Sequence, residues 1–266
     1  MKITMIGAGY VGLVSGTCFS EFGFKVTCVD RDTDKIQSIK NGHIPIYEPG
    51  LDAYVERNIK NGNLSFSNDL KSVIPDSDLI FIAVGTPTRR GDGHADLKFV
   101  YEVAEEVSQY LDGYTVIVDK STVPVGTARE VKRIISKNNP SANFDIVSNP
   151  EFLREGSAIE NFMMPDRIVL GLESKVPEGM LKKLYQASGI DKDKILITDL
   201  ESAELIKYAS NAFLATKISF INEISLLCEK TGADVESVAL GMGMDSRIGE
   251  KFLKTGPGFG GSCFPK

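Results

Sequence analysis

Short apolar runs alternate with amphipathic segments over residues 1–198. Each run is five or six residues long, as is typical of strands buried on both faces of a parallel sheet, and the runs lie at 2–6, 25–29, 79–84, 115–119, 144–148 and 167–171. Segments with helical spacing of apolar residues lie between or beyond them, at 13–21, 32–40, 51–59, 97–111, 127–137 and 178–188. The alternation predicts an α/β fold, a Rossmann-type doubly wound parallel sheet that closes with the strand at 167–171.

A different pattern begins near residue 199. Residues 200–230 contain no Gly or Pro, and their apolar side chains occupy more than one helical face. A long helix of this kind must be buried by more than its own domain, so we expect a homodimer formed through it. Asp234 is placed to cap a short helix that ends near Leu240. We therefore expect two domains, residues 1–198 and residues 199–266.

The first apolar run leads directly into a glycine fingerprint, Gly7-Ala8-Gly9-Tyr10-Val11-Gly12. In a strand–turn–helix context, Gly7 permits the tight turn, Gly9 admits a pyrophosphate, and Gly12 allows close packing of helix on strand. The second run ends at Asp30, whose carboxylate suits a ribose 2′-hydroxyl and repels a 2′-phosphate. The pattern predicts an NAD site.

Two basic residues beside Asp30 leave part of this interpretation open. Arg31 is of a type that accepts a 2′-phosphate, which would favour NADP. Lys35 either reaches the cofactor or is solvated. The weight of the motif favours NAD as the cofactor.

Hydroxyl residues and glycine follow two further predicted strands. Gly85 and Thr86 come directly after the run at 79–84, and Thr122 follows the run at 115–119. The carboxyl ends of strands are where open α/β sheets bind ligands, so these residues are candidates for the cofactor site. Thr122 precedes Pro124 and a predicted helix, and ordinary helix capping is the alternative role for it.

Charged residues near the cofactor cleft are the candidates for chemistry. Glu151 and Glu155 are four positions apart, which would place both carboxylates on one face of a helical turn; a solvated face is the alternative. Lys207 and Asn211 have the same spacing within the long helix. Lys207 is either a surface lysine or, given the apolar surroundings, a buried and paired ammonium.

The last eleven residues hold a cysteine behind four glycines, Gly256-Pro257-Gly258-Phe259-Gly260-Gly261-Ser262-Cys263-Phe264-Pro265-Lys266. These glycines leave backbone open to a ligand, which makes Cys263 a candidate reactive thiol; the alternative is a Gly-rich tail with an incidental cysteine. Cys18, Cys28 and Cys228 lie within apolar stretches and are expected to be small core residues.

Composition narrows the class of partner. A formal charge of −6 gives no general attraction to nucleic acid or anionic membrane, so a small-molecule substrate is favoured. Neither a membrane-spanning run nor a secretory leader is evident in the sequence, and the cysteines show no metal-binding spacing. We expect a cytoplasmic protein without a structural metal.

Six ordered motifs together give a resemblance to a known family. The fingerprint at 7–12, the sequences at 85–87, 121–124, 149–156 and 258–266, and the pair Lys207/Asn211 closely resemble the UDP-glucose/GDP-mannose dehydrogenase family across the whole chain. The segments 148–160 and 165–167 resemble its UDP-glucose branch most. GDP-mannose and UDP-N-acetylmannosamine are the alternative substrates within the family.

The resemblance implies a four-electron oxidation of the sugar C6 alcohol of UDP-glucose to a carboxylate, UDP-glucuronate, with two NAD molecules used in turn. By the same resemblance, Cys263 would trap the aldehyde as a thiohemiacetal and later form a thioester. Lys207 and Asn211 would stabilise the oxyanion, and Glu151 would act in acid–base steps. Thr122 and Glu155 would position water.

The resemblance also implies two sets of ligand-binding residues. The cofactor set is Gly7, Gly9, Tyr10, Val11, Gly12, Asp30, Arg31, Lys35, Gly85, Thr86, Thr122, Glu155 and Lys266. The substrate set is Glu151, Phe152, Leu153, Arg154, Glu155, Lys207, Asn211, Arg247, Phe252, Leu253, Lys254, Thr255, Gly256 and Gly260. Arg247 matches a residue that reaches the substrate of a neighbouring subunit in the family.

The sequence departs from the family pattern after Lys266. In the family an aspartate that assists thioester hydrolysis follows at once, and a further Rossmann-like domain completes the nucleotide-sugar site. This chain is therefore expected to lack the C-terminal UDP-binding domain and to be inactive by itself. Two other functions remain open: a dehydrogenase of the β-hydroxyacid type, which has no use for Cys263, and an NAD-binding, dimerising module without chemistry.

Overall fold

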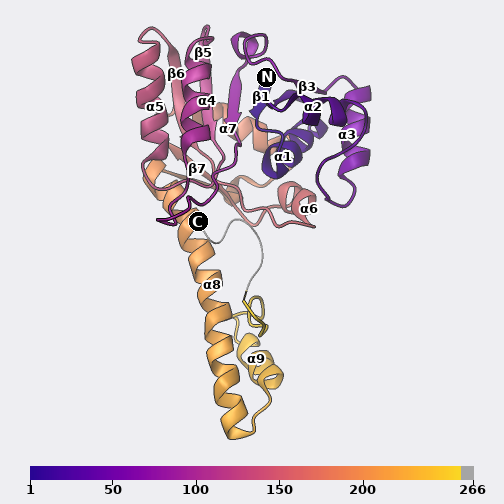
Figure 1. Cartoon of the computed structure of the whole chain (residues 1–266), viewed down its shortest axis with the longest axis vertical. Helices are drawn as coiled ribbons and strands as arrows, with labels where there is room; N and C mark the ends of the chain where they lie inside the picture. Colours follow the sequence, from indigo (N-terminus) through magenta and orange to yellow (C-terminus); the bar gives the residue numbers. More distant parts are fainter. Residues whose placement is uncertain (259–266) are drawn as a thin grey trace.

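The computed structural model describes residues 1–258 and forms an eight-stranded sheet in the order β3-β2-β1-β4-β5-β6-β7-β8 (Figure 1). All neighbouring strands are parallel except β6 and β7. The strands are β1 Lys2–Ile6, β2 Lys25–Val29, β3 Leu64–Ser67, β4 Leu79–Ile82, β5 Tyr114–Asp119, β6 Asn143–Ser148, β7 Ile168–Leu172 and β8 Ile195–Thr198. The predicted α/β class is confirmed, with a mostly parallel Rossmann-like sheet.

Helices cover both faces of the sheet. One apolar core joins the sheet to α1, α2, α3, α6 and α7, and a second joins its other face to α4, α5 and the start of α8. The helices are α1 Tyr10–Glu21, α2 Thr33–Lys40, α3 Leu51–Lys60, α4 Lys98–Ser108, α5 Thr127–Asn138, α6 Ala158–Met163, α7 Val176–Gln186, α8 Leu200–Thr231 and α9 Val235–Gly243, with 3₁₀ turns at Ile74–Asp76 and Lys192–Lys194.

The edges of the sheet differ from the sequence expectation. The strand at β7 does not close the sheet, because β8 pairs with it in parallel on the outside. The opposite edge carries β3, which the sequence pattern did not predict either. Both edge strands are four residues long, and each has polar or exposed positions among its apolar ones, so neither stands out as an apolar run.

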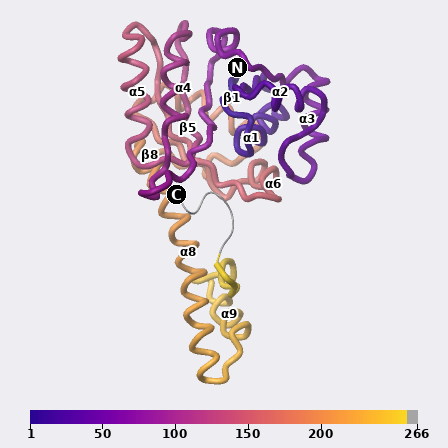
Figure 2. Tube along the Cα trace, viewed as in Figure 1, coloured from indigo at the N-terminus to yellow at the C-terminus, as the bar shows by residue number. Residues whose placement is uncertain are grey.

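Helix α8 is the long helix that the sequence predicts. The carboxylate of Asp199 caps its start by accepting from the Ser202 amide at 2.7 Å, and Gly232 ends it at φ +74°. Its first turns pack so closely on β7 that a Cβ at Gly171 would lie 2.6 Å from the Cβ of Ala203. From there α8 projects away from the sheet, with α9 beside its distal half (Figures 1 and 2).

A buried glutamate also fixes the base of α8 to helix α5. Glu204 accepts from the amides of Gly126 and Ala128 at 2.7 and 2.8 Å, and thereby caps the start of α5. Charge-assisted capping of this kind holds the two helices in register.

Beyond the sheet, α8 and the segment that follows it keep many apolar side chains exposed. The exposed group comprises Leu205, Phe213, Phe220, Leu226, Leu227, Leu240, Met244, Ile248 and Phe252. These side chains are not covered by the rest of residues 1–258, and the homodimer expected from the sequence stays a prediction. Within residues 1–258, no helix combines the length and apolar character needed to cross a bilayer.

Candidate active site

The glycine fingerprint forms the turn between β1 and α1. Gly7 has φ +102°, and a Cβ there would lie 2.6 Å from the Ala83 carbonyl oxygen. At Gly12 a Cβ would lie 1.8 Å from the Gly7 carbonyl oxygen, so no larger residue fits. Helix α1 begins at Tyr10, earlier than the predicted residue 13, and Gly9 at its N-cap provides no side-chain acceptor. A Cβ at Gly9 would meet open space, so a pyrophosphate can approach the first amides of α1, which include that of Val11.

Asp30 lies at the end of β2 beside this turn. Its carboxylate accepts from the Ala8 amide and from Lys35 Nζ, each at 2.9 Å, and from the Asp32 amide at 3.0 Å. Burial opposes ionisation of Asp30, but the hydrogen bonds from Asp32 and Lys35 outweigh it and lower the pKa below its ordinary value. An ionised carboxylate is therefore fixed beside the glycine turn.

Arg31 is directed away from this carboxylate. Its guanidinium lies 4.6 Å from the centre of the Phe99 ring and 3.2 Å from Glu102, both on α4. Lys35 is paired with Asp30 rather than solvated. The two basic residues that left the cofactor choice open are thus both engaged by protein groups.

The turns after β4 and β5, each predicted to lie at the carboxyl end of a strand, are in contact. The hydroxyl of Thr86, which is buried, donates to the Thr122 carbonyl at 2.8 Å. Ser121 Oγ donates to the Val84 carbonyl at 2.9 Å. Gly85 is exposed between them, so the edge of the sheet presents open backbone next to Thr122, which is itself buried.

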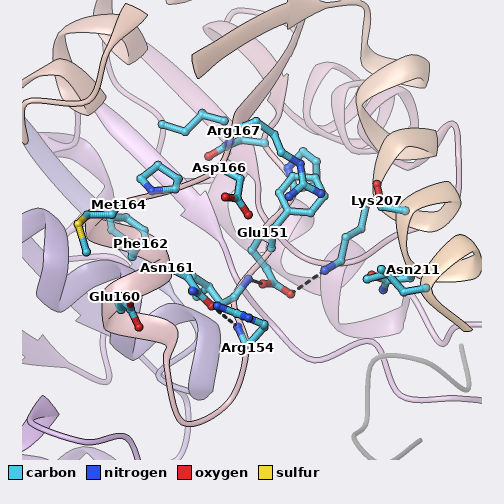
Figure 3. Close-up of a pocket in the computed structure, with 18 of the residues that line it drawn as sticks. Glu151, Arg154, Glu160, Asn161, Phe162, Met164, Asp166, Arg167, Lys207 and Asn211 are labelled. Carbon is cyan, nitrogen blue, oxygen red and sulfur yellow. Dashed lines mark hydrogen bonds and ion pairs between the residues drawn. The ribbon is translucent and has the colours of Figure 1, made fainter. Parts of the chain in front are cut away.

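A cavity of about 640 Å³ lies between the sheet domain and α8 (Figure 3). Seven of the residues predicted for the substrate or the chemistry line it: Glu151, Phe152, Leu153, Arg154, Lys207, Asn211 and Phe252. Within residues 1–258 no three His, Cys, Asp or Glu side chains lie close enough together to hold a metal ion. The groups available for chemistry in this cavity are the ammonium of Lys207, the carboxylate of Glu151 and the amide of Asn211.

Lys207 and Glu151 form the buried ion pair of this cavity. Lys207 Nζ lies 3.2 Å from Glu151 Oε1, and both residues are 5% exposed. The second oxygen, Oε2, accepts from the Leu153 amide at 2.5 Å. Asn211 follows one turn later on α8 and faces the same space (Figure 3). The buried, paired lysine is the arrangement that the sequence left as one of two alternatives.

The aromatic ring of Phe152 lies close to two cations at this site. The Phe152 ring centre is 5.3 Å from Lys207 Nζ and 3.6 Å from the guanidinium carbon of Arg167. Both cations lie within the distance at which a ring face attracts positive charge. Arg154 is held at the rim by Asn161, whose Oδ1 accepts from its backbone amide and its Nε.

The expected helical turn at Glu151 and Glu155 is not formed. Residues 149–156 are irregular, and α6 begins only at Ala158. Glu151 is directed to the cavity, whereas Glu155 is exposed and close enough to Tyr10 to contribute to its raised pKa. The expectation of one shared face was wrong: residues 151–154 lie outside any helix, and the Glu151 carboxylate turns back to accept from the Leu153 amide.

Glu48 holds this irregular segment against the fingerprint helix, and sequence reasoning missed it. Its carboxylate is 6% exposed and accepts from the amides of Gly156 and Ala158 at 2.9 and 2.7 Å. The Tyr10 hydroxyl donates to the same carboxylate and accepts from the Gly156 amide. Burial and the Glu48 hydrogen bond raise the pKa of Tyr10 well above its usual value. The cofactor turn and the Glu151 segment are therefore one connected unit.

The predicted cradle after α9 is only partly at the cavity. Phe252 lines it with φ +66°, a left-handed conformation that is unusual for a bulky residue and clusters at functional sites. Leu253 is buried, and both backbone polar groups of Gly256 bond the Asn222 side chain. Leu253, Lys254, Thr255 and Gly256 are not among the cavity-lining residues.

Arg247 does not reach the cavity of its own chain. Its side chain is 87% exposed and pairs with Asp245 at 2.6 Å. Three predicted site residues, Gly260, Cys263 and Lys266, lie outside the described residues. Of the other cysteines, Cys18, Cys28 and Cys228 are buried as expected, and burial raises the pKa of Cys18 and Cys28 to about 12.

Glu48→Gln should loosen the segment that carries Glu151. Both carboxylate oxygens accept from backbone amides, so the NH₂ group of glutamine would face an N–H donor where one oxygen accepts now, and the remaining oxygen would lose its charge. The change removes at least about 1–2 kcal/mol from that contact. We expect amide hydrogen exchange at Gly156 and Ala158 to become roughly tenfold faster. Glu56→Gln, at an exposed ion pair with Lys60, is the matched control. Unchanged exchange at both amides would show that Glu48 does not hold the segment.

Comparisons with known proteins agree with this geometry. Residues 1–188 match the model of the UDP-glucose/GDP-mannose dehydrogenase family, NAD binding domain, and residues 201–266 match the central domain of the same family. The chain is 58% identical to UDP-glucose 6-dehydrogenase of Rhizobium meliloti and 57% identical to UDP-glucose 6-dehydrogenase TuaD of Bacillus subtilis, with all of this chain aligned. It spans 61% and 57% of the length of these relatives.

Solved structures show the same fold. A UDP-glucose dehydrogenase from Pyrobaculum islandicum superposes with a TM-score of 0.95 at 41% identity, over 99% of this chain and 61% of that one. A GDP-mannose dehydrogenase from Pseudomonas aeruginosa superposes with a TM-score of 0.88 at 34% identity, over 100% of this chain and 62% of that one. With an NAD-binding domain over its first 188 residues, the chain belongs to the UDP-glucose/GDP-mannose dehydrogenase family.

Proposed function

We propose that the intact gene product is an NAD-dependent UDP-glucose 6-dehydrogenase that oxidises the sugar C6 alcohol to a carboxylate. The observation that carries the proposal is the buried Lys207–Glu151 ion pair beside Asn211 in a 640 Å³ cavity. The choice of UDP-glucose is supported by the 57–58% identity to two UDP-glucose 6-dehydrogenases, against 34% to the GDP-mannose enzyme. GDP-mannose and UDP-N-acetylmannosamine remain the alternative substrates.

The residues around the fingerprint fit NAD. The open space at Gly9 and the uncapped start of α1 suit the pyrophosphate, and the charge of Asp30 suits the ribose hydroxyls. Gly85, Thr86 and Thr122 would border the nicotinamide end, with Glu155 and Lys266 completing the set. NAD bound there supplies a hydride acceptor.

Lys207 is the group we assign to the developing oxyanion. Its ammonium is fixed by Glu151 and points into the cavity, so it stabilises negative charge without reorganising during the reaction. Asn211 adds an amide donor from the next turn of α8. Glu151, tied to Lys207, is placed to exchange a proton with a group held at that ammonium.

Cys263 is proposed as the nucleophile from the family resemblance. Removal of hydride and a proton from the C6 alcohol gives an aldehyde, to whose carbon the thiolate adds. A second hydride leaves this adduct to give a thioester. Water then displaces the thiol and releases the carboxylate. Two hydrides leave each sugar, which requires two NAD molecules.

We propose two units, residues 1–198 for NAD binding and residues 199–266, which begin at α8, for the dimer and the thiol. Strand β8 ends at Thr198 and α8 begins at Leu200, which supports this boundary. Phe252 to Gly256 and Gly260 are proposed to hold the nucleotide sugar, with Arg247 reaching the site of a second subunit. Its exposure on its own chain is compatible with that role. For residues 1–266 alone we propose NAD binding without steady turnover.

Two alternative functions of another class predict different results for thiol alkylation and for NADH formation. A β-hydroxyacid dehydrogenase uses a lysine–asparagine pair but no thiol, so alkylation of Cys263 would leave it active. An NAD-binding module without chemistry would form no NADH with any sugar nucleotide. Since burial raises the pKa of Cys18 and Cys28 to about 12, both should resist alkylation, and the reagent would report mainly on other thiols.

Lys207→Met should abolish the proposed reaction while leaving cofactor binding intact. With UDP-glucose and NAD, the intact gene product is expected to form two NADH per sugar. We expect the variant to lose at least about 100-fold in kcat, the size of a lost oxyanion donor. Lys230→Met, on the exposed end of the same helix, is the control. One NADH per sugar, or full activity of the Lys207 variant, would contradict the proposal.

Asp30→Asn should reduce the preference for NAD over NADP. The variant keeps a hydrogen-bonding side chain but loses the negative charge that repels a 2′-phosphate. Titration calorimetry should show NAD bound more tightly than NADP by the unaltered chain and a smaller ratio for the variant. Equal affinities of the unaltered chain for the two cofactors would overturn the assignment.

The exposed apolar face of α8 should form a homodimer. Leu226 and Leu227, 52% and 55% exposed, lie side by side in sequence on its distal half. Replacing both with Asp should convert a dimeric mass in solution scattering to that of one chain. Leu196→Asp, at an exposed residue of β8, should leave the dimer intact. A single-chain mass before any substitution would refute the dimer.

A further inference from the structure

A second lysine, Lys120, is buried in the wall of the same cavity. It follows β5 directly and is 4% exposed. Its Nζ donates to Asn149 Oδ1 at 3.2 Å and lies 5.8 Å from the centre of the Phe162 ring. Neither the family motifs nor the helical spacing in the sequence draws attention to this residue.

The partners of Lys120 fix its position but do not neutralise it. Asn149 Oδ1 accepts from both Lys120 and the buried Tyr185 hydroxyl, and Asn149 Nδ2 donates to the Val169 carbonyl at 2.9 Å. The amide is therefore held in one orientation. An ammonium group has three N–H donors. Within residues 1–258, Asn149 Oδ1 is the one hydrogen-bond acceptor of Lys120 Nζ, so two of its donors have no protein acceptor there.

The charges around this wall do not balance. Glu151 forms its ion pair with Lys207, and no carboxylate in the described part of the chain lies within 4.0 Å of Lys120 Nζ. Burial lowers the pKa of Lys120 to about 8, with Glu151 attracting and Lys207 repelling its charge. Two buried ammonium groups thus share one carboxylate. A buried charge without a close partner costs free energy, which an arriving anion would recover.

We propose that Lys120 binds the anionic, oxidised form of the substrate, the sugar carboxylate, as a second cation beside Lys207. The inference rests on the proposed function, because it needs a substrate that is neutral at the reacting carbon and a product that is charged there. Lys207 is already compensated by Glu151. Of the two buried lysines, Lys120 is the one without an ion pair in the described part of the chain, so it should distinguish the carboxylate from the alcohol.

The test compares binding of UDP-glucose and of its C6 carboxylate, UDP-glucuronate, to the intact gene product without cofactor. Lys120→Met removes the charge and keeps the length of the side chain. Titration calorimetry should show the carboxylate bound about tenfold more weakly or worse, as for a lost charge-assisted hydrogen bond, with UDP-glucose changed less than about threefold. An NAD affinity and a melting temperature equal to those of the unaltered protein would confirm that the Lys120→Met variant folds. If that variant does not fold, Lys120→Gln is used in its place.

Tyr185→Phe is the matched control. It removes the other donor to Asn149 Oδ1 and leaves the ammonium in place, so the selective loss should not occur. Equal weakening of both ligands by Lys120→Met, no weakening, or the same selective loss in Tyr185→Phe would overturn the role of Lys120. If the unaltered protein binds neither sugar nucleotide, the proposed function itself is wrong and this inference falls with it.

Discussion

The ion pair between Lys207 and Glu151 is the contact on which the arrangement of the site depends. Lys207 belongs to α8, and Glu151 belongs to the irregular segment after β6. Because both groups are buried, separating them would leave two unpaired charges inside the protein, which is costly. The ion pair therefore fixes the position of the long helix relative to the sheet domain. The cavity, Asn211 and the ring of Phe152 then follow from that position.

Two further buried carboxylates act in the same way at greater distance. Glu48 joins the fingerprint helix to the segment that carries Glu151, and Glu204 joins α8 to the start of α5. Each satisfies backbone amides that would otherwise be left without partners. The glycine turn, the segment that carries Glu151 and helix α8 are therefore linked by charged groups whose partners lie far apart in sequence.

The extent to which the sequence could predict this differs by element. Helix α8 was predictable because a long run without Gly or Pro and with many apolar residues favours a helix over any other structure. The turn at Gly7 was predictable because the residues that form it are adjacent in sequence. The edges β3 and β8 were not, since polar or exposed positions interrupt both strands and neither forms an apolar run. Glu48 escaped notice because the backbone amides that it accepts from are 108 to 111 positions away. Lys120 stood between a strand and a recognisable motif, and only the packing of Asn149 and Tyr185 reveals that it is buried.

A double-mutant cycle on the free energy of unfolding tests the ion pair most directly. Lys207→Met and Glu151→Leu should each cost about 3–5 kcal/mol, because each leaves the other charge buried and unpaired. The double variant should recover most of that loss, since it replaces the pair by apolar groups. Losses that simply add would contradict the account, because Lys207 and Glu151 would then stabilise the structure independently.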